Sequence, residues 1–148
     1  TNLFMAANDP VFAALDGALV RRKLQRDADF SLADAHGEAT SEKMALGHLV
    51  DGRASMLVGT HTHVPSADHR ILAGGTAYQT DAGMCGDFDS VIGMDKVAAT
   101  DRFTGRGNSR LSVAMGAVTL CGLLVEADAN GLAQTVAPLR AGGGLSSA

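Results

Sequence analysis

The sequence predicts an α/β fold, and three observations lead to that prediction. Segments typical of strand, helix and strand follow one another between residues 30 and 61, an order that indicates a βαβ unit. Two alternating apolar runs near the C-terminus flank Asn130-Gly131, a pair suited to the positive φ angles of a tight β-hairpin. Hydrophobic residues make up 46% of the 148 residues, enough for the core of a single domain.

The first expected element is a helix over residues 10–26. Asp9 suits the N-cap and Pro10 the first turn, because an Asp side chain accepts a backbone N–H and a proline needs no donor there. Apolar side chains then recur at helical spacing at Phe12, Leu15 and Leu19.

The predicted βαβ unit comes next. Residues 30–36 and residues 53–61 are expected to form its strands. The helix between them should begin with Thr40 or Ser41 as its cap and end at Gly52. The residues at helical spacing on it are Met44, Ala45, His48 and Leu49. Both parallel strands should end at the same edge of the sheet, where α/β folds place their ligands.

The rest of the chain carries weaker patterns. Residues 76–80 are expected to be extended, and one short helix is expected within residues 89–103. Residues 1–140 are expected to form the domain, and residues 141–148 a flexible tail.

Composition excludes several classes of function. The net charge is −4 and the twelve Lys and Arg residues are scattered, so nucleic acid is not expected as a stable scaffold partner of this protein. No apolar run approaches the roughly 20 residues that span a bilayer, so no membrane partner and a cytoplasmic location are expected. Cys85 and Cys121 are too few and too far apart for a disulfide framework, so reduced thiols are expected.

Three histidines form the candidate site. His61 and His63 are separated by one residue, so on extended backbone both imidazoles face the same way. His36 ends the neighbouring strand, so three rings can converge. Imidazoles bind Zn, Fe and Mn, and a bound ion makes hydroxide available for hydrolysis near neutral pH. The alternative is a pair that makes only hydrogen bonds.

Three carboxylates accompany these histidines. Asp34 lies on the same strand face as His36, where it can ligate an ion or fix the ring tautomer, and Glu38 is close in sequence. Asp81 lies two residues before Gly83, which favours a turn cap over a role near an ion. His48 is expected on the helix and His69 facing solvent, so neither is placed in the site.

Four long segments of the chain are specific enough for a comparison with known families: DAHGEATSEKMALG, VGTHTHVPSADHRIL, GGTAYQTDAGMCGDFDSVIGMDK and TLCGLLVEADANGLAQTVAPLR. In this order they resemble the YmdB-like metallophosphoesterases, a family of the calcineurin-like phosphoesterases. They cover about residues 30–140 and resemble the C-terminal half of the family. The resemblance implies half of a four-layer αββα sandwich, with a dinuclear metal centre at its strand ends. It also implies hydrolysis of phosphodiesters such as 2′,3′-cyclic nucleotides.

The resemblance assigns a role to each histidine. His36 would ligate the second metal together with His61, and His63 would ligate the first; the two divalent ions would be Fe, Mn or Zn. Two small departures, Ala35 where Phe is usual and Gly37 where Ala is common, leave the ligands untouched. The family's other ligands and its general acid come from an N-terminal half that these residues do not match. No catalytic residue is therefore assigned here, and the isolated chain is expected to have little or no activity.

Two other functions stay open from the sequence. One is an inactive remnant or metal-free interaction module, including a homo-oligomer, which pairs through exposed sheet edges and apolar surface. The other is an amidohydrolase-type metallohydrolase, which also places a His-x-His pair at a strand end. Such enzymes are barrels of about 250 residues, which makes this the weaker alternative.

Overall fold

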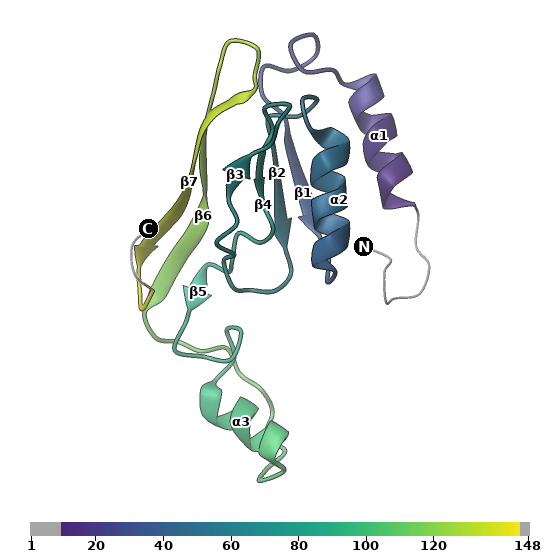
Figure 1. The fold of residues 1–148 in the computed structure, drawn as a ribbon. Helices are drawn as coiled ribbons and strands as arrows, with labels where there is room; N and C mark the ends of the chain where they lie inside the picture. Colours follow the sequence, from purple (N-terminus) through teal and green to yellow (C-terminus); the bar gives the residue numbers. More distant parts are fainter. Residues whose placement is uncertain (1–9, 146–148) are drawn as a thin grey trace.

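Three layers form the body of the protein: two helices, a four-stranded sheet and a β-hairpin (Figure 1). The computed structural model describes residues 10–145. Its elements are α1 (Val11–Arg21), β1 (Leu32–His36), α2 (Thr40–Val50), β2 (Met56–Thr60), β3 (Arg70–Ile71), β4 (Ala77–Gln79), β5 (Gly86–Asp87), α3 (Lys96–Thr104), β6 (Val118–Ala127) and β7 (Ala133–Gly142). The predicted mixed α/β class is confirmed.

The order of the four-stranded sheet is β1-β2-β4-β3. Strands β1, β2 and β4 are parallel, and β3 runs antiparallel to β4. Because α2 connects β1 to β2, the predicted βαβ unit is confirmed. In the register of these two strands His36 lies opposite Thr60, so both strands end at the same edge.

Strand β2 is buried on both faces, as expected for a central parallel strand. Leu57 faces the helices and joins a cluster with Leu46 and Val50 of α2. Met56 and Val58 face the other way and pack against the β6–β7 hairpin. This alternation of side chains along one strand holds the helical layer and the hairpin on opposite faces of the sheet.

The buried face of α2 differs from the prediction. It consists of Lys43, Leu46, Gly47 and Val50. The residues predicted at helical spacing are exposed or, for Leu49, half-buried: Met44, Ala45, His48 and Leu49. Gly47 gives the physical reason, because a Cβ there would lie 2.7 Å from the ring of Tyr78. The glycine lets this side of the helix approach the sheet closely.

The helix ends also differ from the prediction. Helix α1 ends before residue 26, because the residue that follows its last turn adopts extended backbone. The predicted cap at Thr40 or Ser41 is wrong, since Ala39 holds the N-cap position of α2 and no side chain caps it. Asp9, the predicted N-cap of α1, lies outside the described residues.

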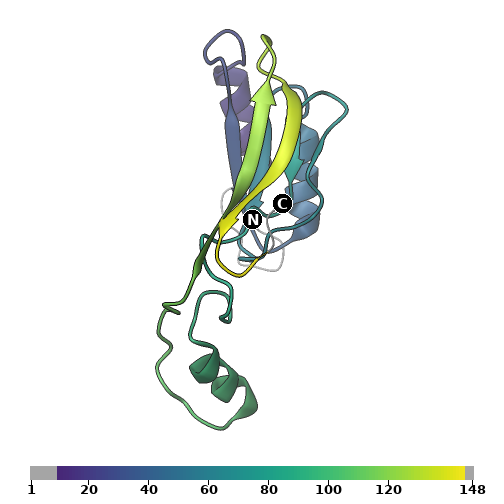
Figure 2. The same ribbon diagram turned by 90° about the vertical axis from the view of Figure 1, so that its left-hand side faces the viewer.

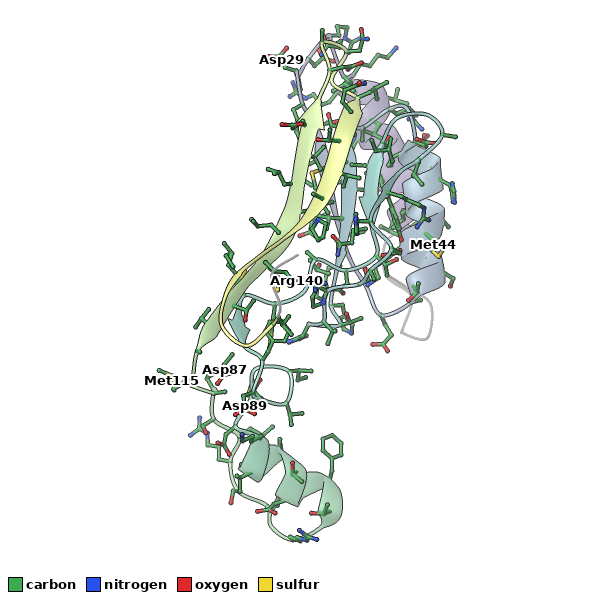
Figure 3. The ribbon with its side chains drawn as sticks, turned by 60° about the vertical axis from the view of Figure 1, so that its left-hand side comes forward. Asp29, Met44, Asp87, Asp89, Met115 and Arg140 are labelled. Atoms are coloured by element: carbon green, nitrogen blue, oxygen red, sulfur yellow. The ribbon has the colours of Figure 1, made fainter. Side chains whose placement is uncertain are left out.

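Residues 86–117 leave the body and form an arm (Figure 2). At its base β5 pairs with β6, and Figure 3 labels Asp87 there. The carboxylate of Asp87 accepts the backbone N–H of Gly116 at 2.9 Å. Helix α3 lies beyond, with the side chain of Asp95 accepting the backbone N–H of Ala98 as its N-cap. The short helix predicted in this region is confirmed, and so is the extended stretch at β4. Strands β3 and β5 were not predicted.

The predicted hairpin is confirmed, but its turn is wider than expected. Strands β6 and β7 are joined by a loop in which Asp128 accepts the backbone N–H groups of Asn130 and Leu132. Gly131 has a φ of 74°, whereas Asn130 does not have a positive φ, so this is not a two-residue turn with both residues left-handed. Strand β7 extends to Gly142, and the last three residues of the predicted tail lie outside the described part.

The outer face of the hairpin is uncovered in residues 10–145. Its large apolar residues are exposed by 62%, 47%, 59% and 42%: Val118, Leu120, Leu124 and Leu139. The described residues thus supply three layers, and the fourth layer implied by the family resemblance is not among them. Within the same residues, every helix is too short or too polar to cross a membrane.

Gly59→Ala tests the close contact between β2 and the end of β4. A Cβ on Gly59 would lie 1.8 Å from the carbonyl oxygen of Thr80 and 2.7 Å from Cδ of Lys43, so the backbones would have to separate. We expect the free energy of unfolding, measured by urea denaturation, to fall by at least about 2 kcal/mol. Gly122→Ala is the matched control, because nothing lies within 4 Å of its Cβ. The control should change stability by less than about 0.5 kcal/mol, and equal effects of the two substitutions would contradict this packing.

Candidate functional site

Two of the three candidate histidines meet at the edge of the sheet. His36 is the last residue of β1, and His61 follows the last residue of β2. Nε2 of His36 lies 3.1 Å from Nδ1 of His61. The rings meet edge to face, with centroids 5.0 Å apart and planes inclined by 76°. The contact follows from the register that aligns His36 with Thr60.

A hydroxyl group connects Asp34 to His36. Oγ1 of Thr60 donates to Oδ1 of Asp34 at 3.0 Å and lies 3.1 Å from Nδ1 of His36. Because the hydroxyl proton is directed at the carboxylate, Thr60 accepts the hydrogen bond from Nδ1–H of His36. This places the ring proton on Nδ1 and directs the lone pair of Nε2 toward His61.

Glu38 contacts the other side of the His61 ring. Its Oε2 atom lies 2.7 Å from Nε2 of His61, so both ring nitrogens of His61 have partners. The side chain of Glu38 is 62% exposed and that of His61 is 38% exposed. Water therefore screens this contact, and its main effect is to orient the ring.

The turn after β2 is not extended. The φ angles are 124° at His61 and 67° at His63, so the extended backbone predicted for this pair is wrong. Within the described chain, no hydrogen bond or ion pair joins the side chain of His63 to His36 or His61. Left-handed backbone at a residue with a side chain costs about 1–3 kcal/mol and persists only where the surroundings enforce it.

The buried side chain of Asp81 stabilises this turn through hydrogen bonds to backbone N–H groups. Its carboxylate is 2% exposed and accepts the backbone N–H of Thr62 at 2.8 Å and of Gly83 at 2.9 Å. Burial raises the pKa of Asp81, but these hydrogen bonds and the charge of Lys43 outweigh burial, so its pKa lies below the ordinary value. Asp81 therefore caps its own turn, as expected, and also accepts a hydrogen bond from Thr62, the residue between His61 and His63.

Sequence reasoning missed Lys43 and Thr60. Lys43 is fully buried, with Nζ 3.3 Å from Oδ2 of Asp81 and 3.3 Å from the carbonyl oxygen of Thr60. A lysine in a helix is normally exposed, so the sequence carried no signal for this pair. Thr60 could have been found, because it ends an apolar strand directly beside the histidine pair.

The donors at the strand ends fit part of a metal site. Among residues 10–145, no group of three or more His, Cys, Asp or Glu side chains is arranged to hold an ion. The nitrogens of His36 and His61 are nevertheless 3.1 Å apart, close to the roughly 3.0–3.4 Å expected for two nitrogens at about 2.1 Å from a common ion. The relay from Asp34 through Thr60 is also typical of ligating histidines. The two nitrogens therefore suit two positions around one ion.

Two further histidines and the two cysteines differ in burial. His48 is exposed on α2, in line with its exclusion from the site. His69 is half-buried, and its buried Nδ1 has no hydrogen-bond partner among residues 10–145, so the prediction that it faces solvent is wrong. Cys85 and Cys121 are both free thiols, and burial raises the pKa of Cys121.

Comparison with known proteins gives one family. A family model described as YmdB-like protein matches residues 1–139. A 2',3'-cyclic-nucleotide 2'-phosphodiesterase of Bacillus subtilis (strain 168) is 54% identical over 95 residues, which are 64% of this chain and 36% of that protein. The chain thus spans about a third of that relative's length.

Two solved structures resemble the whole described fold. A hypothetical protein from Thermus thermophilus has a TM-score of 0.84 and 38% identity, over 97% of this chain and 55% of that one. A novel phosphatase from Mycoplasma pneumoniae has a TM-score of 0.80 and 35% identity, over 96% of this chain and 50% of that one. The sheets and the arm therefore follow an arrangement shared with longer proteins.

Thr60→Val tests the link between Asp34 and His36. Valine keeps the shape of threonine but accepts no hydrogen bond, so the His36 ring proton loses the acceptor that holds it on Nδ1. We expect the Nδ1-protonated form of His36 to dominate in the wild type and to lose that preference in the variant. Ring nitrogen shifts in NMR spectra measure this. Thr135→Val, which removes a hydroxyl from the hairpin, is the control. A wild-type ring protonated on Nε2 would contradict the assignment.

Proposed function

This chain belongs to the YmdB-like protein family, and on that basis we propose that it forms part of a metal-dependent phosphodiesterase. The observation that carries the proposal is the 3.1 Å approach of His36 Nε2 to His61 Nδ1 at two aligned strand ends. The phosphodiesterase and the phosphatase named among the similar proteins support the reaction class.

Each histidine has a separate role in this proposal. His36 and His61 hold one divalent ion together, and His63 holds a second ion. Fe, Mn and Zn all suit imidazole nitrogen. When bound, such ions polarise a phosphoryl oxygen and offset the charge that develops there. Asp34, acting through Thr60, fixes the His36 tautomer, Glu38 orients His61, and Asp81 supports the turn.

We propose that residues outside this chain complete the site. Three neutral imidazoles with no bridging carboxylate cannot hold two divalent ions close together, because nothing offsets the repulsion between the ions. A further helical layer on the outer face of the β6–β7 hairpin would give the four-layer sandwich and cover the exposed leucines of that face.

The proposed substrate is a small phosphodiester of the 2′,3′-cyclic nucleotide class. Support comes from the name of the Bacillus subtilis relative. The general acid would come from the part of the protein outside this chain, so the described residues bind and orient but transfer no proton. A reducing, cytoplasmic setting belongs to the proposal, and the two free thiols are compatible with it.

Zinc binding to the 148-residue chain tests the ligand assignment. We expect calorimetry to detect one weakly bound Zn²⁺ per chain, and His61→Ala to weaken that binding by at least about tenfold, since the variant loses a ligand from a small set. His48→Ala removes an exposed histidine from α2 and should leave the affinity unchanged. Equal losses in the two variants would contradict the assignment.

Turnover gives the second measurement. The isolated chain should hydrolyse a 2′,3′-cyclic nucleotide slowly or not at all, because part of its ligand set is supplied elsewhere. Full-strength turnover that survives His61→Ala would contradict the proposal. A chain that binds no ion would instead favour the metal-free interaction module.

The amidohydrolase alternative has lost its basis, since residues 10–145 form open sheets and not a barrel.

A further inference from the structure

The buried ion pair between Lys43 and Asp81 lies directly beneath the turn that carries His61 and His63. The side chains are 0% and 2% exposed, and Nζ of Lys43 lies 3.3 Å from Oδ2 of Asp81. A buried pair of charges loses the hydration of both groups, so it contributes little net stability compared with apolar packing. A stabilising role alone therefore does not explain why the chain places a lysine here.

The path of the lysine side chain depends on a glycine in β2. A Cβ on Gly59 would lie 2.7 Å from Cδ of Lys43, so the missing side chain leaves the space through which the lysine passes. Gly47, one turn further along α2, lets the helix approach Tyr78 in the same way. Two glycines thus bring the ammonium group from the helical layer to the end of β2.

At the end of β2 the pair contacts the backbone on both sides of His61. Lys43 donates to the carbonyl oxygen of Thr60 at 3.3 Å, one residue before His61. Asp81 accepts the N–H of Thr62 at 2.8 Å, one residue after it. The backbone of His61 itself has a φ of 124°, a conformation that needs support from its surroundings.

We propose that Lys43 and Asp81 are positioning residues for the histidine turn. They act together as a clamp that fixes the backbone on either side of His61 and so keeps its ring against His36. Neither side chain touches an ion or a substrate in this role. The role of this turn in holding a metal ion rests on the proposed function. The fixing of the backbone by Lys43 and Asp81 does not, because it is a property of the metal-free chain.

Asp81→Asn and Lys43→Met test the clamp. Asparagine keeps the size of aspartate but places an NH₂ group beside the Thr62 N–H or the lysine, and methionine keeps the length of lysine without its charge. In the metal-free chain, the Thr62 amide should exchange with solvent at least about tenfold faster in both variants, while amides in the β6–β7 ladder keep their protection. Zn²⁺ affinity should fall by about 10–100-fold, the usual effect of losing a residue that orients a ligand.

Arg53→Met is the matched control. It also removes a cation from an ion pair, that of Arg53 with Asp16, but at the opposite end of β2. It should change neither Thr62 exchange nor Zn²⁺ affinity.

Three results would overturn the clamp. They are unchanged Thr62 exchange in folded variants, an equal response in Arg53→Met, and loss of β6–β7 protection in both clamp variants, which would make the pair a requirement of the whole fold.

The clamp and the metal site can fail separately. Faster Thr62 exchange in the clamp variants of a chain that binds no Zn²⁺ would keep the clamp and reject the metal site. Zn²⁺ binding that His61→Ala weakens, together with unchanged Thr62 exchange in the clamp variants, would keep the metal site and reject the clamp.

Discussion

The parallel pairing of β1 with β2 is the constraint on which the candidate site depends. Its register sets His36 opposite Thr60, so the chain leaves β2 beside an imidazole that already occupies the sheet edge. Parallel strands with their ends at one edge collect side chains that lie far apart in sequence. Here they bring together Asp34, His36 and Thr60 and allow a 3.1 Å contact with His61.

The turn that follows β2 is held against a local cost. Positive φ at His61 and at His63 opposes folding by about 1–3 kcal/mol each. Hydrogen bonds to charged groups contribute roughly 1.5–3 kcal/mol each, and Asp81 accepts two from the backbone near this turn. The supporting interactions are thus of the same size as the strain, so the shape of the turn depends on buried groups beneath it.

The sequence predicted most of the larger elements but few of the contacts between them. Apolar alternation predicted the βαβ unit and the hairpin because side-chain periodicity is local. It failed for the buried face of α2, where Gly47 against Tyr78 decides which side approaches the sheet. It also placed His61 and His63 on one extended face, since nothing local indicates that β2 ends at Thr60. Lys43 was missed because only tertiary packing buries it.

The most direct test of the account is the distance between the rings of His36 and His61 in the metal-free chain in solution. Nuclear Overhauser effects between protons of the two imidazoles report on that distance at the edge of the sheet. The structure predicts cross-peaks between these rings, since their centroids are 5.0 Å apart. Absence of such cross-peaks in a folded chain, with the β1–β2 backbone contacts still present, would contradict it.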